Sequence, residues 1–213
     1  MGIVLSTIPG SDGVDGVITT NKLILSEKNV AQLVSSYTKH QFLPVVPVPD
    51  LRNLFEVSFG HKTKLEDNSP LLEALTVSQK VFRDGLTVNT QEVLVGLVLI
   101  CDAPWPTRAA LLFDIFKCVG SEEMGYDDLL LASQMVVMVL CRLWGTHRWS
   151  AKTINSLTEA IADAAFTRLN KEIDEFIDHK KFVTWAMERF HESIVIDNSE
   201  SLKRLYQSPH IPV

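Results

Sequence analysis

The chain has 213 residues, of which 46% are hydrophobic and 22% charged, and its formal net charge at pH 7 is −6. Such a chain suits a globular protein with one large domain or two small lobes. Because nucleic-acid binding depends on Lys and Arg side chains that neutralise phosphates, an acidic chain without basic blocks argues against a nucleic-acid partner.

The N-terminal arm, residues 1–24, combines a modification pattern with loop-forming residues. The first residues, MGIVLS, fit M-G-x-x-x-[ST], in which Gly2 is the acceptor for N-myristoylation. The following stretch contains Pro9 and three further glycines, a composition typical of a flexible arm. A lipid tether at Gly2 and a frayed terminus are both consistent with these residues. One acyl chain alone gives only reversible membrane binding.

Residues 25–101 predict an N-terminal lobe of helices. Apolar residues recur at helical spacing in the first of them, which begins near Ser26. The stretch 42–50 holds three prolines, so we expect an extended connector there and no helix. Asn89 and Glu92 resemble a capping box before a helix that is almost wholly apolar. Helices are expected over about 26–40, 50–59, 69–82 and 91–101.

The segment DAPWP, residues 102–106, interrupts the helical pattern and predicts a boundary between two lobes. Residues 107–191 then form the C-terminal lobe, in which Ser150 is placed to cap a helix. A polar tail over 192–213 ends the chain. Helices are expected over about 107–117, 126–144, 151–169 and 179–191.

Two segments of the C-terminal lobe, 108–137 and 161–190, share one plan: an amphipathic run, a polar loop and a second amphipathic run. In each loop one apolar residue, Met124 or Ile177, precedes the next helix by a few residues. This is the outline of an EF-hand pair, in which the apolar residue at loop position 8 pairs with its partner loop. Fainter copies are expected in the N-terminal half, at 58–69 with Leu65 and at 82–92 with Val88. The sequence therefore predicts an all-α fold of four degenerate EF-hand helix–loop–helix units in two lobes.

The third loop, 117–128, has lost the residues that hold calcium. A working loop places oxygen ligands at positions 1, 3, 5, 7, 9 and 12, with glycine at position 6. Position 1 is Lys117, position 3 is Val119 and position 6 is Glu122. A lysine puts positive charge where the divalent cation would lie, so we expect no calcium in this loop.

The fourth loop, 170–181, keeps several oxygen side chains but also ends in a cation. Position 6 is Glu175, and position 12, where a calcium loop has a bidentate glutamate, is Lys181. We expect a solvated acidic loop without a bound cofactor, and weak calcium or magnesium binding is the alternative. The candidate ligands for that alternative are Asn170, Glu172, Asp174 and Asp178.

The centre of the chain, TQEVLVGLVLICDAPWPTRAALLFDIF, resembles the neuronal calcium sensor, calcineurin B and calaxin group. The matching positions are Gly96, Leu97, Arg108, Phe113 and Phe116. The N-terminal pattern also fits the myristoylated members of that group. The resemblance implies EF-hand lobes that receive a partner's helix, and its calaxin-type members imply a cilium or flagellum as one setting.

No GxSxG, P-loop, HExxH or dinucleotide-binding fingerprint occurs, so we expect no enzyme. The leading hypothesis is a calcium-independent, EF-hand-like adaptor that holds an amphipathic helix of a partner protein in an apolar groove. We expect it in the cytoplasm, at a membrane surface or in a ciliary assembly. The alternative is a weak calcium or magnesium sensor acting through the fourth loop. The groove candidates, which could equally be core residues, are Phe113, Phe116, Met135, Met138, Trp144, Trp185 and Met187.

Overall fold

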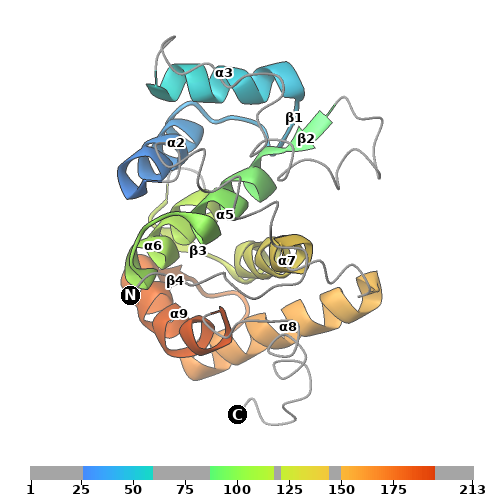
Figure 1. Cartoon of the computed structure of the whole chain (residues 1–213). Helices are drawn as coiled ribbons and strands as arrows, with labels where there is room; N and C mark the ends of the chain where they lie inside the picture. The colour runs from blue at the N-terminus through green and yellow to red at the C-terminus, as the bar shows by residue number, and fades with distance from the viewer. Residues whose placement is uncertain (1–25, 60–86, 118–120, 144–149, 195–213) are drawn as a thin grey trace. The chain divides into compact units, whose positions relative to one another are not determined.

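The computed structural model describes residues 26–59, 87–117, 121–143 and 150–194. Its described part contains seven helices and two short antiparallel strand pairs (Figure 1). The expected all-α class is confirmed at this level, with a small amount of sheet added to it. The chain divides into two compact units between Ala103 and Pro104, inside the segment DAPWP.

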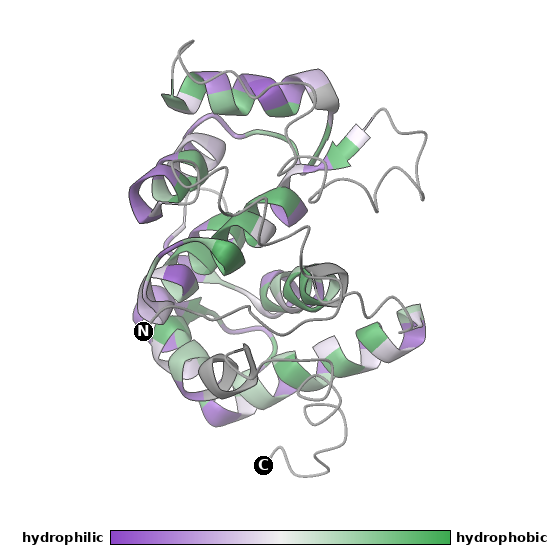
Figure 2. Ribbon diagram, in the orientation of Figure 1, coloured by the Kyte–Doolittle hydropathy of each residue, from purple (hydrophilic) through white to green (hydrophobic). Residues whose placement is uncertain are grey.

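The N-terminal unit is built around α5, whose residues are buried from Thr90 to Leu99. Figure 2 shows hydrophobic colouring over most of this helix. A helix that is apolar on all sides must be covered on all sides, and α2 packs against it. The described elements of this unit are α2 (Glu27–Lys39), β1 (Val45–Pro47), α3 (Val48–Phe59), β2 (Thr87–Asn89) and α5 (Thr90–Ile100).

Both ends of α2 are set by local side-chain and backbone bonds. At its start, the Ser26 side chain accepts a hydrogen bond from the Asn29 N–H at 3.4 Å. At its end, the Phe42 N–H donates to the Tyr37 carbonyl at 3.2 Å, and Gln41 adopts a left-handed φ of 50°. This is the Schellman ending of a helix, which turns the chain sharply toward β1.

Strand β1 pairs with β2 in antiparallel register, with Val46 opposite Val88. A first loop at 58–69 would place Leu65 opposite Val88, but the residue opposite Val88 is Val46. Leu65 lies outside the described residues. The prediction of an extended connector over 42–50 is correct for 45–47, which form β1. It is wrong for 48–50, because α3 begins at Val48. A proline is tolerated in the first helical turn, where its missing N–H would have no intrahelical partner, and this explains Pro49.

The C-terminal unit consists of two helix pairs joined by a two-residue ladder. Helix α6 packs on α9, and α7 packs on α8. Strands β3 and β4 pair in antiparallel register, with Met124 opposite Ile177, as the sequence predicts. The elements are α6 (Trp105–Phe116), β3 (Glu123–Met124), α7 (Tyr126–Leu143), α8 (Ala151–Arg168), β4 (Ile177–Asp178) and α9 (His179–Ile194).

Aromatic rings form the core between α6 and α9. The ring centroids of Phe113 and Phe182 lie 5.5 Å apart, and those of Phe182 and Trp185 lie 5.9 Å apart. The Trp105 Nε1–H donates to the Ala186 carbonyl at 3.3 Å, which fixes the start of α6 against α9. Ring contacts of this kind stabilise the unit beyond the burial of the rings themselves.

Polar and aromatic contacts join α7 to α8. The Tyr126 hydroxyl donates to Asp163 Oδ1 at 2.6 Å. The Tyr126 ring also packs edge-on against Phe166, with centroids 5.3 Å apart. Further along, the Gln134 side chain donates to Asn155 at 3.3 Å. These bonds hold the two helices at fixed positions along their length.

One spacing recurs at all four strands. Each strand contains a buried apolar residue two positions before the first residue of the following helix. The four residues are Val46 before α3, Val88 before α5, Met124 before α7 and Ile177 before α9. Each one lies opposite another member of the set across a ladder. Both units therefore repeat the same helix–strand–helix register.

Among the helices in the described part of the chain, none has the length and apolarity needed to cross a bilayer.

Candidate functional site

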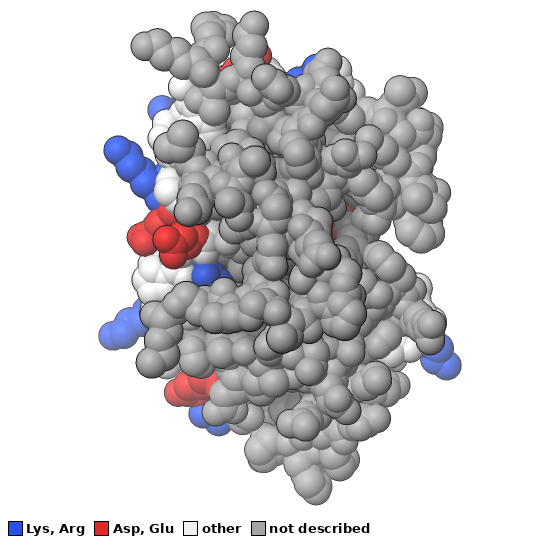
Figure 3. All heavy atoms as spheres, in the orientation of Figure 1, with Lys and Arg blue, Asp and Glu red and all other residues white. Residues whose placement is uncertain are grey.

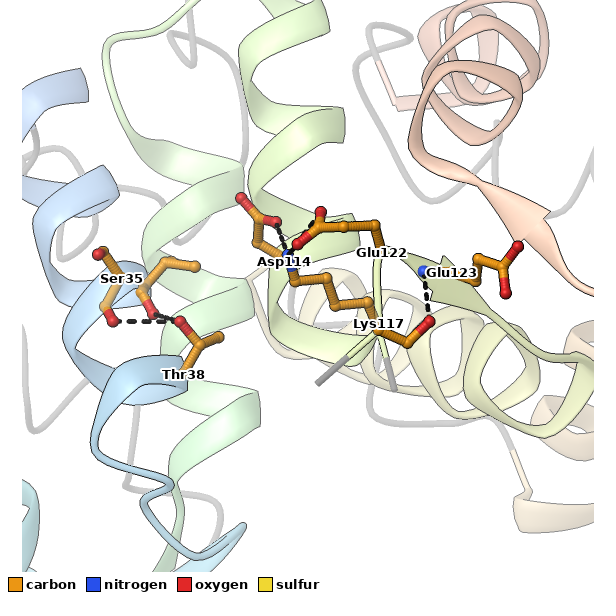
Figure 4. Close-up of polar contacts among 8 residues, drawn as sticks. Ser35, Thr38, Asp114, Lys117, Glu122 and Glu123 are labelled. Carbon is orange, nitrogen blue, oxygen red and sulfur yellow. Dashed lines mark hydrogen bonds and ion pairs between the residues drawn. The ribbon is translucent and has the colours of Figure 1, made fainter. Parts of the chain in front are cut away.

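The third loop, 117–128, contains a lysine ammonium held by three carboxylate oxygens (Figure 4). Lys117 Nζ lies 2.8 Å from Glu122 Oε1 and 2.9 Å from Oε2. The same atom lies 3.2 Å from Asp114 Oδ1. The loop thus carries its own positive charge at position 1, where a calcium loop would have an anionic ligand.

The contacts between Lys117 and its carboxylate partners shift the pKa values of Lys117 and Glu122. Burial alone would lower the pKa of Lys117, but hydrogen bonds and charges from Glu122 and Asp114 outweigh burial and raise it. The hydrogen bond from Lys117, followed by its charge, lowers the pKa of the Glu122 carboxyl. Both shifts favour the charged forms, so the pair persists through the neutral pH range.

The last carboxylate of the third loop is used as a helix cap. Asp128 Oδ2 accepts a hydrogen bond from the Gly125 N–H at 2.9 Å. The Gly125 carbonyl in turn accepts the Leu129 N–H at 3.1 Å, the first bond of α7. This is the backward-reaching half of a capping box, in which the side chain at N3 satisfies the N-cap N–H. One oxygen of the position-12 carboxylate is therefore directed to the backbone.

The fourth loop, 170–181, contains two further internal ion pairs. Lys171 Nζ lies 2.7 Å from Glu175 Oε1, and the Glu172 N–H donates to Glu175 Oε2 at 2.8 Å. The Lys181 N–H donates to Asp178 Oδ1 at 2.9 Å, and Lys181 Nζ lies 3.6 Å from Oδ2.

These bonds also shift the titration of the two carboxylates. The bond from Lys171, followed by the Glu172 N–H, lowers the pKa of Glu175. The Lys181 backbone N–H is the main cause of the lowered pKa of Asp178. A carboxylate that a lysine and a backbone N–H already satisfy gains less from an added cation.

The backbone of the two loops also departs from a calcium loop. Among the described non-glycine residues, a positive φ occurs only at Gln41 and Asn170. Position 6 therefore lacks the left-handed turn in both loops, since Glu122 and Glu175 stand there. Asn170, at position 1, has φ 52° and ends α8 in a Schellman motif, with Lys171 N–H bonded to Phe166 O at 2.9 Å.

The four predicted ligands of the fourth loop are placed as follows. Asn170 ends a helix, Glu172 and Asp174 are exposed at the loop tip, and Asp178 is bonded to Lys181. The described ranges contain no group of three or more His, Cys, Asp or Glu residues arranged to hold a metal ion.

Most of the predicted groove residues lie in the core. Phe113 is fully buried, and Phe116, Met135 and Trp185 expose less than a tenth of their surface. Their ring and apolar contacts within the C-terminal unit account for this, and an open groove in this conformation would need them accessible. Met138 and Met187 are half-buried. Trp144 and the acceptor Gly2 lie outside the described residues.

Sequence reasoning missed the exposed apolar side chains of the fourth loop. Ile173 is 68% exposed and Phe176 is 47% exposed. The sequence did contain a signal for this exposure. Ile173 and Phe176 are large apolar residues in a polar loop, and neither one falls on the apolar face of a helix or at the ladder position, which Ile177 occupies. Elsewhere, the described charged side chains on the face drawn in Figure 3 carry both signs.

No family model, curated protein or solved structure matches the chain.

Proposed function

We propose that this chain is a calcium-independent, EF-hand-like adaptor with two helix–loop–helix units in each lobe. The observation that supports it best is the repeated register of Val46, Val88, Met124 and Ile177. Each is buried, each precedes a helix by two residues, and each faces a counterpart across an antiparallel ladder. Paired EF-hands join their loops through an apolar residue at the corresponding position.

Independence from calcium follows from the chemistry of the loops. Lys117 supplies a fixed positive charge to the third loop, and Lys171 and Lys181 supply it to the fourth. A divalent cation would have to displace these ammonium groups and be repelled by any that remained. Sensor EF-hands open when calcium binds. In this proposal the loops of the C-terminal lobe are held instead by their own ion pairs and need no such opening.

The adaptor role rests on the apolar character of the C-terminal lobe. Met138 on α7 and Met187 on α9 are half-buried, in a lobe whose core contains packed aromatic rings. Methionine side chains adapt to different shapes, and EF-hand lobes take up amphipathic helices between their own helices. In this proposal the partner helix contacts the two methionines and separates the helices behind them.

Capture of the partner with and without calcium tests this proposal. The tagged full chain would be incubated with cell extract in calcium or in EGTA, and bound proteins would be quantified by mass spectrometry. We expect one partner at equal yield in both conditions, and a lower yield with Met138→Glu or Met187→Glu. Thr167→Glu, an exposed position on α8, is the matched control. Capture that requires calcium would reject calcium independence, and equal yield with both Met variants would reject the groove.

A further inference from the structure

The tip of the fourth loop presents two large apolar side chains to solvent, Ile173 at 68% and Phe176 at 47% exposure. Single exposed apolar residues are common on protein surfaces, but these two lie three positions apart on one short loop. We propose that Ile173, Asp174 and Phe176 form a docking site for a partner segment that carries Lys or Arg residues around an apolar anchor.

The loop is held in place before any partner arrives. Both carboxylate oxygens of Glu175 are bonded, one to Lys171 Nζ at 2.7 Å and the other to the Glu172 N–H at 2.8 Å. The Glu175 N–H returns a bond to the Glu172 carbonyl at 3.0 Å. Because a fixed loop loses little conformational freedom on binding, more of the contact energy appears as affinity.

The Phe176 ring lies against the third loop of the same lobe. A Cβ atom added to Gly125 would lie 3.5 Å from Phe176 Cε1 and 3.4 Å from Asp128 Oδ2. The ring therefore lies close to Gly125, the residue that precedes α7, while nearly half of the Phe176 side chain remains exposed. Aromatic residues, phenylalanine among them, are enriched at the cores of protein interfaces.

Charge determines which partner the tip can accept. The stretch from Asn170 to Asp178, NKEIDEFID, contains four carboxylates and one lysine. Lys171 is engaged by Glu175, and no ion pair in the described part of the chain involves Glu172 or Asp174, which flank Ile173. A basic segment complements these two carboxylates, whereas an anionic membrane surface would be repelled. This inference rests on the proposed adaptor role and assigns the partner contact to the loop tip.

A designed peptide of known chemistry can test the site in the full chain. The probe is a fluorescein-labelled 14-residue peptide of two Leu-Lys-Lys-Leu-Leu-Lys-Leu repeats, and the control peptide has glutamate in place of each lysine. Fluorescence anisotropy should show saturable binding of the lysine peptide and none of the glutamate peptide. We expect Ile173→Ser and Phe176→Ser each to weaken binding about fivefold or more. Asp174→Lys should weaken it on the order of tenfold.

Two matched control variants distinguish binding at the loop from non-specific hydrophobic or electrostatic binding elsewhere on the surface. Leu43→Ser removes an apolar side chain that is also 68% exposed, and Glu159→Lys reverses an exposed charge on α8. Both should bind like the unsubstituted chain, with circular dichroism confirming the fold of every variant. The loop site is overturned if the loop variants bind normally, if the controls lose as much affinity, or if no saturable binding occurs. Normal binding by the loop variants together with loss in Met187→Glu would leave the adaptor role standing.

Discussion

Lysine ammonium groups pair with carboxylates in and beside the loops of the C-terminal lobe. Lys117 lies within 3.2 Å of oxygens from two carboxylates, and Lys171 lies 2.7 Å from a third. A covalently attached ammonium needs no ligand supply and cannot dissociate. It also has one charge instead of two and no fixed coordination number, so it can hold a loop together without setting the geometry of a calcium site.

Replacing Lys117 should return Glu122 to ordinary titration. In Lys117→Gln the hydrogen bond and charge that lower the pKa of Glu122 are gone, so that pKa should rise toward the usual glutamate range. Carbon-detected NMR of the carboxyl group would follow it. Lys152→Gln, at an exposed position on α8, should leave it unchanged. An unaltered Glu122 titration in Lys117→Gln would contradict the ion pair.

The lowered pKa of Glu122 also determines how the stability of the fold changes with pH. Because the pKa of Glu122 is lowered in the folded state, the pair stabilises the fold above the unfolded glutamate pKa. That stabilisation is lost as the pH falls through the folded pKa. Glu122 is largely exposed, so solvent screening keeps the effect small.

Tyr126 reports on the contact between α7 and α8. Its hydrogen bond to Asp163, aided by burial, raises its pKa to about 12. Since the folded pKa is raised, the stabilisation is complete below the unfolded tyrosine pKa and is lost as the pH rises through about 12. Asp163→Asn should lower the Tyr126 pKa toward 10, as read from ring-carbon NMR. The pKa of Tyr37, raised to about 12 mainly by burial in the other unit, should not change. A Tyr126 pKa that stayed near 12 would show that Asp163 is not its cause.

At the scale of elements, the two ladders organise the helices of each unit. Met124 and Ile177 are fully buried and lie opposite each other on the strands that precede α7 and α9. Residues opposite each other on antiparallel strands interact directly through their side chains. The ladder is only two residues long, so its stability depends on this apolar contact and on the helices that follow it.

Removing either ladder residue should therefore destabilise the C-terminal unit. Met124→Ala and Ile177→Ala should each lower the free energy of unfolding by about 2–5 kcal/mol, measured by urea denaturation. The double variant should lose less than the sum, by at least about 0.5 kcal/mol, because each single variant already breaks the shared contact. Val57→Ala, at an exposed position on α3, is the control. Strict additivity would mean that the two side chains do not interact.

Sequence reasoning worked best where local chemistry decides the structure. Asn89 and Ser150 cap α5 and α8 as predicted, and α2 begins directly after Ser26, near which a helix was expected. The pairing of Met124 with Ile177 was also predictable, since both loops keep the length and polarity of the motif. Val46 was missed because its loop is short, rich in proline and without carboxylates, so no ligand pattern marked it.

Burial of the predicted groove residues could not be read from the sequence either. An apolar stripe at helical spacing is the same whether it faces the core or a partner, and only packing distinguishes the two. Phe113 and Trp185 meet Phe182 inside the lobe. The exposure of Ile173 and Phe176 depends likewise on the path of the loop, which the bonds of Glu175 determine.

At the scale of the whole molecule, two units share one register and the described loops of the C-terminal unit carry internal cations. In the proposed function this scaffold needs no bound metal, and its partner contacts lie on the apolar surfaces of the C-terminal unit. A site with a dissociation constant of 10 μM would add about 2.7 kcal/mol of stability at 1 mM calcium. Such a gain would raise the melting temperature by several degrees.

Calcium titration of the full chain measures whether the loops of this protein bind the ion. Calorimetry from EGTA-treated protein should show only dilution heat, and the melting temperature should be the same in 1 mM calcium and in EGTA. Lys181→Glu, which restores a carboxylate at the last position of the fourth loop, should still bind weakly at best, because Lys171 and Glu175 remain. Saturable heat that disappears in Asp174→Ala, together with a calcium-dependent rise in melting temperature, would contradict the account.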